Sequence, residues 1–233
     1  MVGVSQDSDL PQGEAKVKAV DDIFDVIAPK YDLLNRLLTF GMDIGWRRKT
    51  VRTLRLPAGS VVLDLACGTG DLCRELTRRG HRAVGVDRSA GMLAAHRTTS
   101  PLVRGDALRL PFPDHSVDGI VCGFGIRNFA SLKPFFAECA RVLRPGGRVA
   151  LLEVAQPQNA VLRWGHGLYF GKVVPLVGGL LSDRAAYQYL PRSVAYLPPP
   201  NRMVAMLAEA GFGAAHRETL SSGIAQLLTG TRR

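Results

Sequence analysis

VVLDLACGTGDL, at residues 61–72, is the stretch that decides the fold. Its first seven residues form an apolar run interrupted only by Asp64, which is typical of a buried β-strand. The residues from Asp71 onward have the pattern of a helix. Gly68 and Gly70 allow a tight turn between the two elements and a close approach of a ligand to the backbone. No GxGxxG dinucleotide fingerprint and no Gly-Lys-Ser/Thr of a P-loop is present. The turn therefore favours an adenosine-type ligand that lacks a pyrophosphate.

The same order of strand and helix continues outward from this turn. The sequence predicts strands at 61–67, 83–87, 102–106, 117–124 and 148–155, helices at 71–80, 89–97, 131–144 and 201–211, a turn at 145–147, and β-like runs at 214–220 and 224–232. Strands that alternate with helices form parallel sheets with helices on both faces. We therefore expect one α/β sheet, which the last two runs close.

The segments that flank this series differ from it in composition. We expect residues 1–18, which are polar with scattered Gly, Pro and Asp, to be disordered, and residues 19–233 to form a single domain. Apolar residues at helical spacing, interrupted by Pro29, indicate a helical cap at 19–56. Residues 157–200 are rich in Gly, Pro and aromatic side chains, and we interpret them as an insertion on the substrate side.

The composition of the 233-residue chain limits the function classes. Its net charge of +10 is spread along the sequence, so we expect no specific nucleic-acid partner. The start of the chain lacks the apolar core of a signal peptide, and the apolar stretch at 173–182 is shorter than the about 20 residues that cross a bilayer. The sequence therefore predicts a cytoplasmic protein. The four cysteines show no CxxC pair and no metal-ligand spacing, so we expect reduced core thiols and no metal site.

Two carboxylates end the next two strands at the edge where the glycine turn lies. Asp87 follows that turn by about 20 residues, a position from which a carboxylate accepts hydrogen bonds from a ribose diol. The alternative role of Asp87 as a helix N-cap is less favoured, because Ser89 can supply that cap. Asp106 is placed to accept from an adenine amino group, although a turn aspartate taken alone is more often structural.

At these positions the sequence resembles the class I S-adenosylmethionine-dependent methyltransferases, and more narrowly the ubiquinone/menaquinone biosynthesis C-methyltransferase family. The resemblance covers about residues 20–230, and its motifs are YDLLNRLLTFGMDIGWRR (31–48), DLACGTGDL (64–72), VDRSAGMLAA (86–95), GDALRLPFPD (105–114), FGIRNF (124–129), RVLRPGGRVALLE (141–153) and AYQYLPRSVAYLP (186–198). Many methyltransferases share the glycine turn and GDALRLPF. The motif at 31–48, FGIRN and AYQYLP are much more specific to the narrower family.

The resemblance implies a Rossmann-like seven-stranded sheet, mostly parallel with a reversed last strand, and S-adenosylmethionine as the cofactor. Together with the glycine turn and the two carboxylates, it implies that the cofactor is bound by Asp64, Gly68, Thr69, Gly70, Asp87, Asp106, Ala107 and Gly123. Many family members carry Ser where Gly123 stands, so we expect any cofactor contact there to be through the backbone. They also carry His, Ser and Glu where Asp43, Ala155 and Arg192 stand, and these departures concern the substrate rather than the cofactor.

Two residues past the fourth strand and one in the cap are the candidates for catalysis. A quinol ring carbon becomes nucleophilic when a neighbouring hydroxyl loses its proton, so a base or a cation must assist. Arg127 is expected to hold the oxyanion, directly or through water, and Asn128 to hydrogen-bond the other ring oxygen. The alternative for Arg127 is a surface ion pair. Tyr31 forms a helical cluster with Asp32 and Asn35 that closes over the cofactor or supports the cap.

The resemblance leads to one main function and two alternatives. The main one is C-methylation of a reduced polyprenyl quinol, above all demethylmenaquinol to menaquinol. The alternatives are a paralogous methyltransferase of secondary metabolism that acts on a phenolic or quinone-like acceptor, and a regulatory protein that binds S-adenosylmethionine without catalysis. We interpret the apolar stretch at 164–179 either as a lid that receives a polyprenyl tail or touches a membrane, or as an ordinary buried helix. The sequence leaves a homodimer and peripheral membrane contact open.

Overall fold

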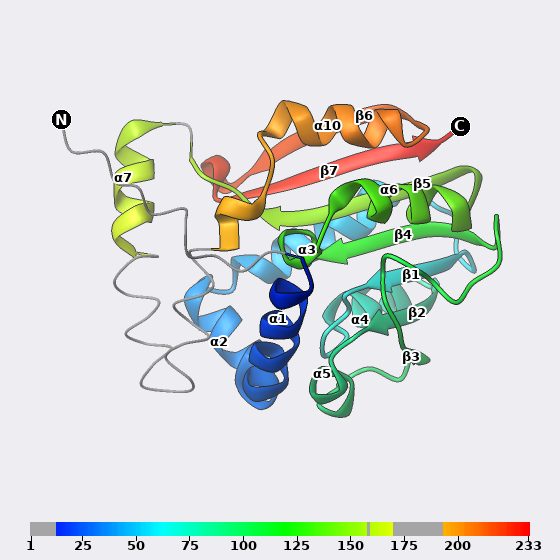
Figure 1. Ribbon diagram of the computed structural model, residues 1–233, viewed down its shortest axis with the longest axis horizontal. Helices are drawn as coiled ribbons and strands as arrows, with labels where there is room; N and C mark the ends of the chain where they lie inside the picture. The colour runs from blue at the N-terminus through cyan, green and yellow to red at the C-terminus, as the bar shows by residue number, and fades with distance from the viewer. Residues whose placement is uncertain (1–12, 158, 170–192) are drawn as a thin grey trace.

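The computed structural model of the chain describes residues 13–157, 159–169 and 193–233. Within these residues one seven-stranded sheet, with the order β3-β2-β1-β4-β5-β7-β6, forms the centre of the fold (Figure 1). The strands are β1 (Val61–Leu65), β2 (Arg82–Asp87), β3 (Leu102–Arg104), β4 (Val117–Gly123), β5 (Leu143–Val154), β6 (Phe212–Leu220) and β7 (Ala225–Arg232). The predicted Rossmann-like sheet is confirmed.

The directions of the strands also match the prediction. The first five strands pair in parallel, and β7 lies antiparallel between β5 and β6. Four of the five residues of β1 are buried, because β1 lies inside the parallel part of the sheet with helices on both faces. The strand order reverses between β1 and β4, and in sheets of this kind ligands bind in the crevice at that carboxyl edge.

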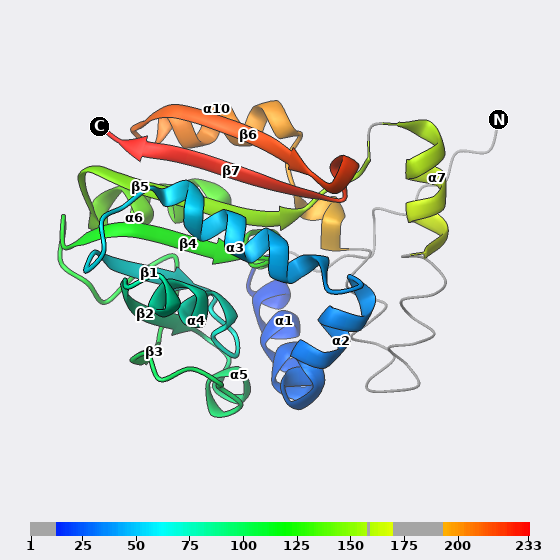
Figure 2. The same ribbon diagram turned by 180° about the vertical axis from the view of Figure 1, so that it is seen from behind.

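Helices cover the two faces of the sheet in separate layers (Figures 1 and 2). One layer contains α6 (Leu132–Val142) and α10 (Pro200–Glu209), and the other contains α3 (Met42–Leu54) and α4 (Asp71–Arg78). The buried side chains accordingly form two clusters, and successive residues of β1 belong to different ones. Each layer therefore buries one face of the sheet, and the carboxyl edge stays available for a site.

The N-terminal helices form a cap at this carboxyl edge (Figure 1), but α3, which the predicted cap at 19–56 included, packs on one face of the sheet instead. Helix α1 (Gly13–Ile27) is followed by the 3-10 turn η1 (Ala28–Lys30) and by α2 (Tyr31–Leu38). The break in helical structure predicted at Pro29 is therefore confirmed. A proline in the middle of a helix removes a backbone donor and disfavours the helical conformation of the residue before it, which explains the break.

The predicted disorder of residues 1–18 is wrong for residues 13–18, which begin α1. The rest of that segment lies outside the described residues. A contact distant in sequence accounts for the longer helix, since Lys16 Nζ donates a hydrogen bond to the Phe129 carbonyl oxygen at 2.7 Å. The same ammonium lies 3.8 Å from the centroid of the Tyr196 ring, and burial lowers its pKa to about 8. The composition of the segment carries no signal of these partners.

Most of the other predicted boundaries differ by one or two residues from those of the structure, and the largest differences concern β5 and α5. The strand predicted to begin at residue 148 begins at Leu143, because Leu143 pairs with Val117 before the register of β4 and β5 shifts. Helix α6 accordingly ends at Val142, and the predicted turn at 145–147 lies inside β5. Helix α5 (Ala90–Ala94) is shorter than predicted at its C-terminal end.

The insertion on the substrate side is described only in part. It contributes α7 (Ala160–Leu168) and the 3-10 turn η4 (Val194–Tyr196). Residues 158 and 170–192 lie outside the described residues, and with them most of the lid predicted at 164–179. In the described part of the chain, every helix is too short or too polar to cross a membrane.

Candidate active site

The glycine turn after β1 lies at the centre of the site. Gly68 and Gly70 have φ angles of 55° and 90°, a region that other residues rarely adopt. A Cβ atom at Gly70 would also lie 2.5 Å from Thr98 Cγ2, so the position has no room for a side chain. The turn leads directly into α4, whose N-terminus favours negatively charged groups.

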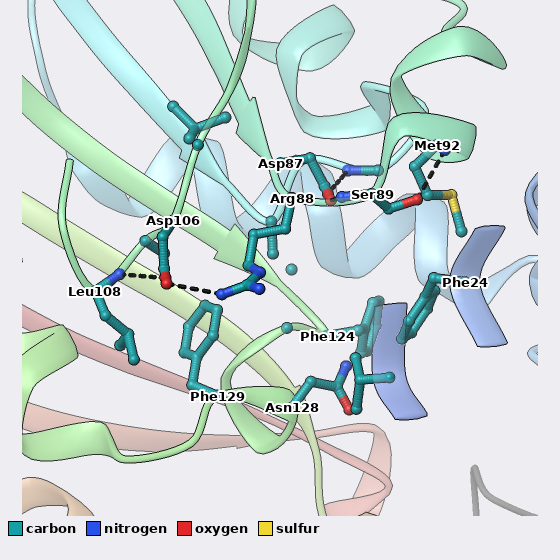
Figure 3. A pocket seen from close by; sticks show the side chains of 18 of the residues that line it. Phe24, Asp87, Arg88, Ser89, Met92, Asp106, Leu108, Phe124, Asn128 and Phe129 are labelled. Carbon is teal, nitrogen blue, oxygen red and sulfur yellow. Dashed lines mark hydrogen bonds and ion pairs between the residues drawn. The ribbon is translucent and has the colours of Figure 1, made fainter. Parts of the chain in front are cut away.

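Asp87, at the end of β2, ties this turn to the neighbouring strand. Its carboxylate accepts the Gly68 N–H at 2.7 Å and the Ser89 N–H at 2.9 Å. Ser89 Oγ accepts the Met92 N–H at 2.9 Å, so the predicted cap of α5 at Ser89 is confirmed. Asp87 lines a pocket (Figure 3), and burial raises its pKa above the usual value. Each of its oxygens has capacity for a further hydrogen bond, such as one from a ribose hydroxyl.

Asp106 lies on another wall of this first pocket, and Arg88 reaches across to it (Figure 3). Asp106 Oδ1 accepts the Leu108 N–H at 2.9 Å, and Oδ2 accepts from Arg88 Nη1 at 2.8 Å. Arg88 Nη2 also donates to Asp21 on α1 at 3.2 Å. Arg88 is absent from the predicted site residues, although a residue directly after Asp87 leaves the strand at the ligand-binding edge.

Helix α1 and the start of α2 close the first pocket from outside. Val20 and Phe24 line it from α1, and Tyr31 lines it from α2. Asp25 Oδ1 accepts the Gly91 N–H at 2.9 Å, which holds α1 against α5. The cap is therefore a wall of the site as well as a cover of the fold.

The predicted cofactor residues fall into two neighbouring pockets. Those that line the first pocket are Gly68, Asp87, Asp106, Ala107 and Gly123. Those that line a second, polar pocket are Asp64, Gly68, Thr69 and Gly123. Gly70 lines neither pocket and instead shapes the turn between them.

The polar pocket contains a carboxylate oxygen that lacks a partner. Asp64 is 1% exposed, and its Oδ2 accepts the Cys73 N–H at 3.1 Å. Its Oδ1 has no hydrogen-bond partner among the described residues, and burial raises the pKa of the group to about 7. Nearby, Thr69 Oγ donates to Asp32 at 2.6 Å. Because an unpaired buried oxygen is costly, this pocket suits a ligand with a cationic donor group.

A third cavity is a large apolar chamber of about 600 Å³. Tyr31 and Phe124 line both this chamber and the first pocket, so the two cavities meet at these side chains. Most of the other lining side chains are apolar: Leu38, Phe40, Met42, Trp46, Val154, Pro157, Val161, Leu162, Val194 and Ile224. The chamber therefore suits a flat apolar molecule next to a polar ligand in the first pocket.

Arg127 brings a positive charge to the wall of this chamber. Its guanidinium forms an ion pair with Glu153, donates to the Phe124 carbonyl oxygen at 2.7 Å, and donates from Nε to Ser193 Oγ at 3.1 Å. Arg127 is 5% exposed and Glu153 on β5 is fully buried. The alternative of a surface ion pair is therefore wrong, because the pair is buried. These contacts fix the orientation of the guanidinium.

The other two predicted catalytic residues lie in different places. Tyr31 lines all three cavities, and burial raises the pKa of its phenol although the Arg127 charge opposes the shift. The phenol is therefore protonated at neutral pH and can donate a hydrogen bond. Asn128 lines the first pocket and not the chamber, so the structure does not bring it together with Arg127 at the substrate side.

Comparisons with known proteins identify the family of this chain. The model of the ubiE/COQ5 methyltransferase family matches residues 12–232. The demethylmenaquinone methyltransferase of Thermus thermophilus is 43% identical over 220 residues, which cover 90% of this chain and 100% of that protein. The ubiquinone/menaquinone biosynthesis C-methyltransferase UbiE of Geobacter sulfurreducens is 40% identical over 232 residues, which cover 93% of this chain and 90% of that protein.

Solved structures share the fold at lower identity. The cyclase SpnF matches with a TM-score of 0.66 and 16% identity, over 95% of this chain and 96% of SpnF. A likeness of this kind supports the fold alone, whereas the family model and the relatives cover nearly the whole chain. The chain therefore belongs to the ubiE/COQ5 methyltransferase family, and the predicted S-adenosylmethionine-dependent methyltransferase is confirmed.

Proposed function

We propose that this enzyme transfers a methyl group from S-adenosylmethionine to a ring carbon of a reduced polyprenyl quinol, and that demethylmenaquinol is the acceptor. The meeting of two unlike cavities supports this proposal most strongly. A pocket with two carboxylates and an apolar chamber with a fixed cation share Tyr31 and Phe124. The name of the Thermus thermophilus relative favours demethylmenaquinol over other quinols.

The residues of the first pocket and of the polar pocket fit the cofactor. In this proposal Asp87 accepts from the ribose hydroxyls, and Asp106 with Arg88 contacts the adenine. Asp64 and Thr69 line the polar pocket, where the Asp64 oxygen that has no partner among the described residues fits the ammonium of the methionine part. When bound, S-adenosylmethionine supplies a methyl group on a positively charged sulfur.

The chain's own contribution to the reaction is position and charge. Methylation of a ring carbon requires the quinol to lose a hydroxyl proton, and a nearby fixed cation favours the resulting phenolate. Arg127 supplies that cation at the chamber wall, and the protonated Tyr31 donates a hydrogen bond where the cavities meet. The apolar walls exclude water and hold the ring. Asn128 contacts the ligand in the first pocket rather than the quinol.

Asp43 favours a second candidate acceptor. Its carboxylate lines the chamber at a position where many family members carry histidine. The group is 1% exposed, accepts from Thr39 Oγ at 2.8 Å and pairs with Arg47. A buried carboxylate in place of an imidazole changes the hydrogen bonds that an acceptor meets, so a phenolic acceptor of secondary metabolism is the second candidate. The cytoplasmic location stays a prediction.

Transfer of labelled methyl from S-adenosylmethionine to reduced demethylmenaquinone tests the proposed acceptor. We expect a product with the methyl group on a ring carbon, and kcat/KM for this naphthoquinol roughly tenfold or more above that for a 2-polyprenyl-benzoquinol or a simple phenol. Product mass and fragmentation locate the methyl group. Cofactor binding without transfer to either quinol would contradict the proposal and favour the phenolic acceptor.

Substitution of Arg127 tests the role of the fixed cation. Removal of Arg127 alone would leave Glu153 buried without its partner, at a cost of about 3–5 kcal/mol, so the matched variant is Arg127→Met with Glu153→Gln. We expect this variant to fold, to bind S-adenosylhomocysteine as the parent does in calorimetry, and to lose about 10²–10³-fold in kcat. Arg127→Lys should retain more activity, because it keeps the charge. A folded double variant with the parent's kcat would show that Arg127 has no part in turnover.

The pH dependence of stability tests the unpaired carboxylate. The pKa of Asp64 rises from 3.8 to about 7 on folding, so its protonated form stabilises the cofactor-free protein below about pH 4, and this contribution is lost as the pH rises to about 7. We expect Asp64→Asn to raise the free energy of unfolding at alkaline pH by roughly 1–4 kcal/mol in urea titrations and to weaken S-adenosylmethionine binding. An unchanged pH profile of stability in the variant would be inconsistent with a raised pKa of the buried Asp64 carboxyl group.

A further inference from the structure

The exposed large apolar side chains are concentrated on one part of the molecule. All nine in the described residues lie on α1, on α2, on the connection from α2 to α3, on the first turn of α3, or on α7. Eight of them form what we call the apolar rim: Leu33, Leu37, Phe40, Ile44, Val161, Leu162, Trp164 and Leu168. Phe40 is 77% exposed and Trp164 is 73% exposed. A concentration of this kind marks a surface that is covered by something else.

The two halves of the rim meet at the mouth of the chamber. The Tyr169 hydroxyl, directly after α7, donates to the Leu38 carbonyl oxygen of α2 at 2.9 Å. The rings of Phe40 and Tyr169 lie 5.7 Å apart between centroids. Phe40, Val161 and Leu162 are exposed and also line the chamber. The chamber is therefore continuous with the rim, at the carboxyl edge of the sheet where α2 and α7 lie (Figure 1).

The charge on this surface has one sign. Three residues of Asp, Glu, Lys and Arg type are exposed on α2, on the first half of α3 and on α7, and all three are arginines: Arg36, Arg48 and Arg163. The two acids of these stretches, Asp32 and Asp43, are buried. Apolar side chains interspersed with arginine fit the interface of a bilayer that contains anionic lipids, where the rings and aliphatic chains enter the headgroup region and the guanidinium groups meet phosphates.

We propose that the apolar rim docks on the surface of an anionic lipid bilayer, and that the polyprenyl quinol enters the chamber from that membrane. The inference rests on the proposed function, because the polyprenyl tail is what keeps the acceptor in the membrane. Docking at the rim would place the chamber mouth against the lipid, so the ring could reach Tyr31 and Phe124 while the tail stays in an apolar environment.

Trp164 provides a native probe of docking. The only other tryptophan, Trp46, is 6% exposed, so a change in emission on adding vesicles reports on Trp164. With the full chain, we expect vesicles of phosphatidylglycerol and phosphatidylcholine to shift the emission to shorter wavelengths. Vesicles of phosphatidylcholine alone should bind more weakly, because the attraction of the arginines is absent.

A pair of double variants tests the location of the docking surface. Leu37→Glu with Trp164→Glu places two carboxylates on the rim without touching a cavity, and we expect vesicle affinity in cosedimentation to fall about tenfold or more. Thr77→Glu with Ala137→Glu makes the same change in charge at exposed positions of α4 and α6, and it should bind nearly as the parent does. Equal binding by both variants, or no binding by the parent, would overturn the proposal.

Two further measurements separate this proposal from the proposed function. Methyl transfer to a tail-less naphthoquinol in vesicle-free buffer should be the same in the rim variant and the parent, whereas transfer to the tailed quinol in vesicles should fall only in the rim variant. Vesicle binding without methyl transfer to either quinol would refute the quinol function and leave the docking surface supported. A rim variant that changes the oligomeric state in size-exclusion chromatography, with vesicle binding unchanged, would assign the rim to a second copy of the chain and overturn the proposal.

Discussion

The carboxylate of Asp87 is the constraint on which the site depends. It accepts the N–H groups of Gly68 and Ser89 at 2.7 and 2.9 Å, and so joins the turn after β1 to the turn after β2. Both turns leave the sheet at its carboxyl edge, beside the point where the strand order reverses. The crevice therefore has a defined shape before a ligand enters. Any substitution that moves Asp87 would displace the glycine turn and the start of α5 together.

The cap converts this crevice into compartments of opposite character. Two hydrogen bonds hold helix α1 in place. Near its start the Lys16 ammonium donates to the Phe129 carbonyl oxygen, and near its end the Asp25 carboxylate accepts the Gly91 N–H. The chain that follows places Tyr31 where the first pocket, the polar pocket and the apolar chamber meet. A buried ion pair such as Arg127–Glu153 adds little net stability, because its desolvation cost offsets the attraction between the charges. The Arg127–Glu153 pair instead serves the site by holding a cation in a fixed place.

The features that were predicted correctly depend on residues that are close together in the sequence. The apolar run before Gly68, the cap at Ser89 and the helix break at Pro29 are local signals, and all three are found in the structure. What sequence reasoning could not supply are contacts between distant segments. Lys16, which lies in the part of α1 that was predicted to be disordered, contacts a residue 113 positions away. The burial of Arg127 likewise depends on β5, which lies beside β4 only after the sheet has formed. The position of Asn128 in the first pocket follows from the 3-10 turn after β4, whose geometry has no signal in the composition. Arg88, by contrast, could have been found from its place directly after Asp87.

If the proposed reaction is right, the acceptor ring and the methyl donor meet at Tyr31 and Phe124. A crystal structure of the enzyme with S-adenosylhomocysteine and a tail-less naphthoquinone would locate both ligands. We expect the cofactor to contact Asp87, Asp106 and Asp64, and the quinone ring to lie in the chamber with one oxygen facing Arg127 and a ring carbon facing the cofactor sulfur. A quinone bound outside the chamber, or a cofactor that occupies the chamber itself, would refute a meeting at these two side chains.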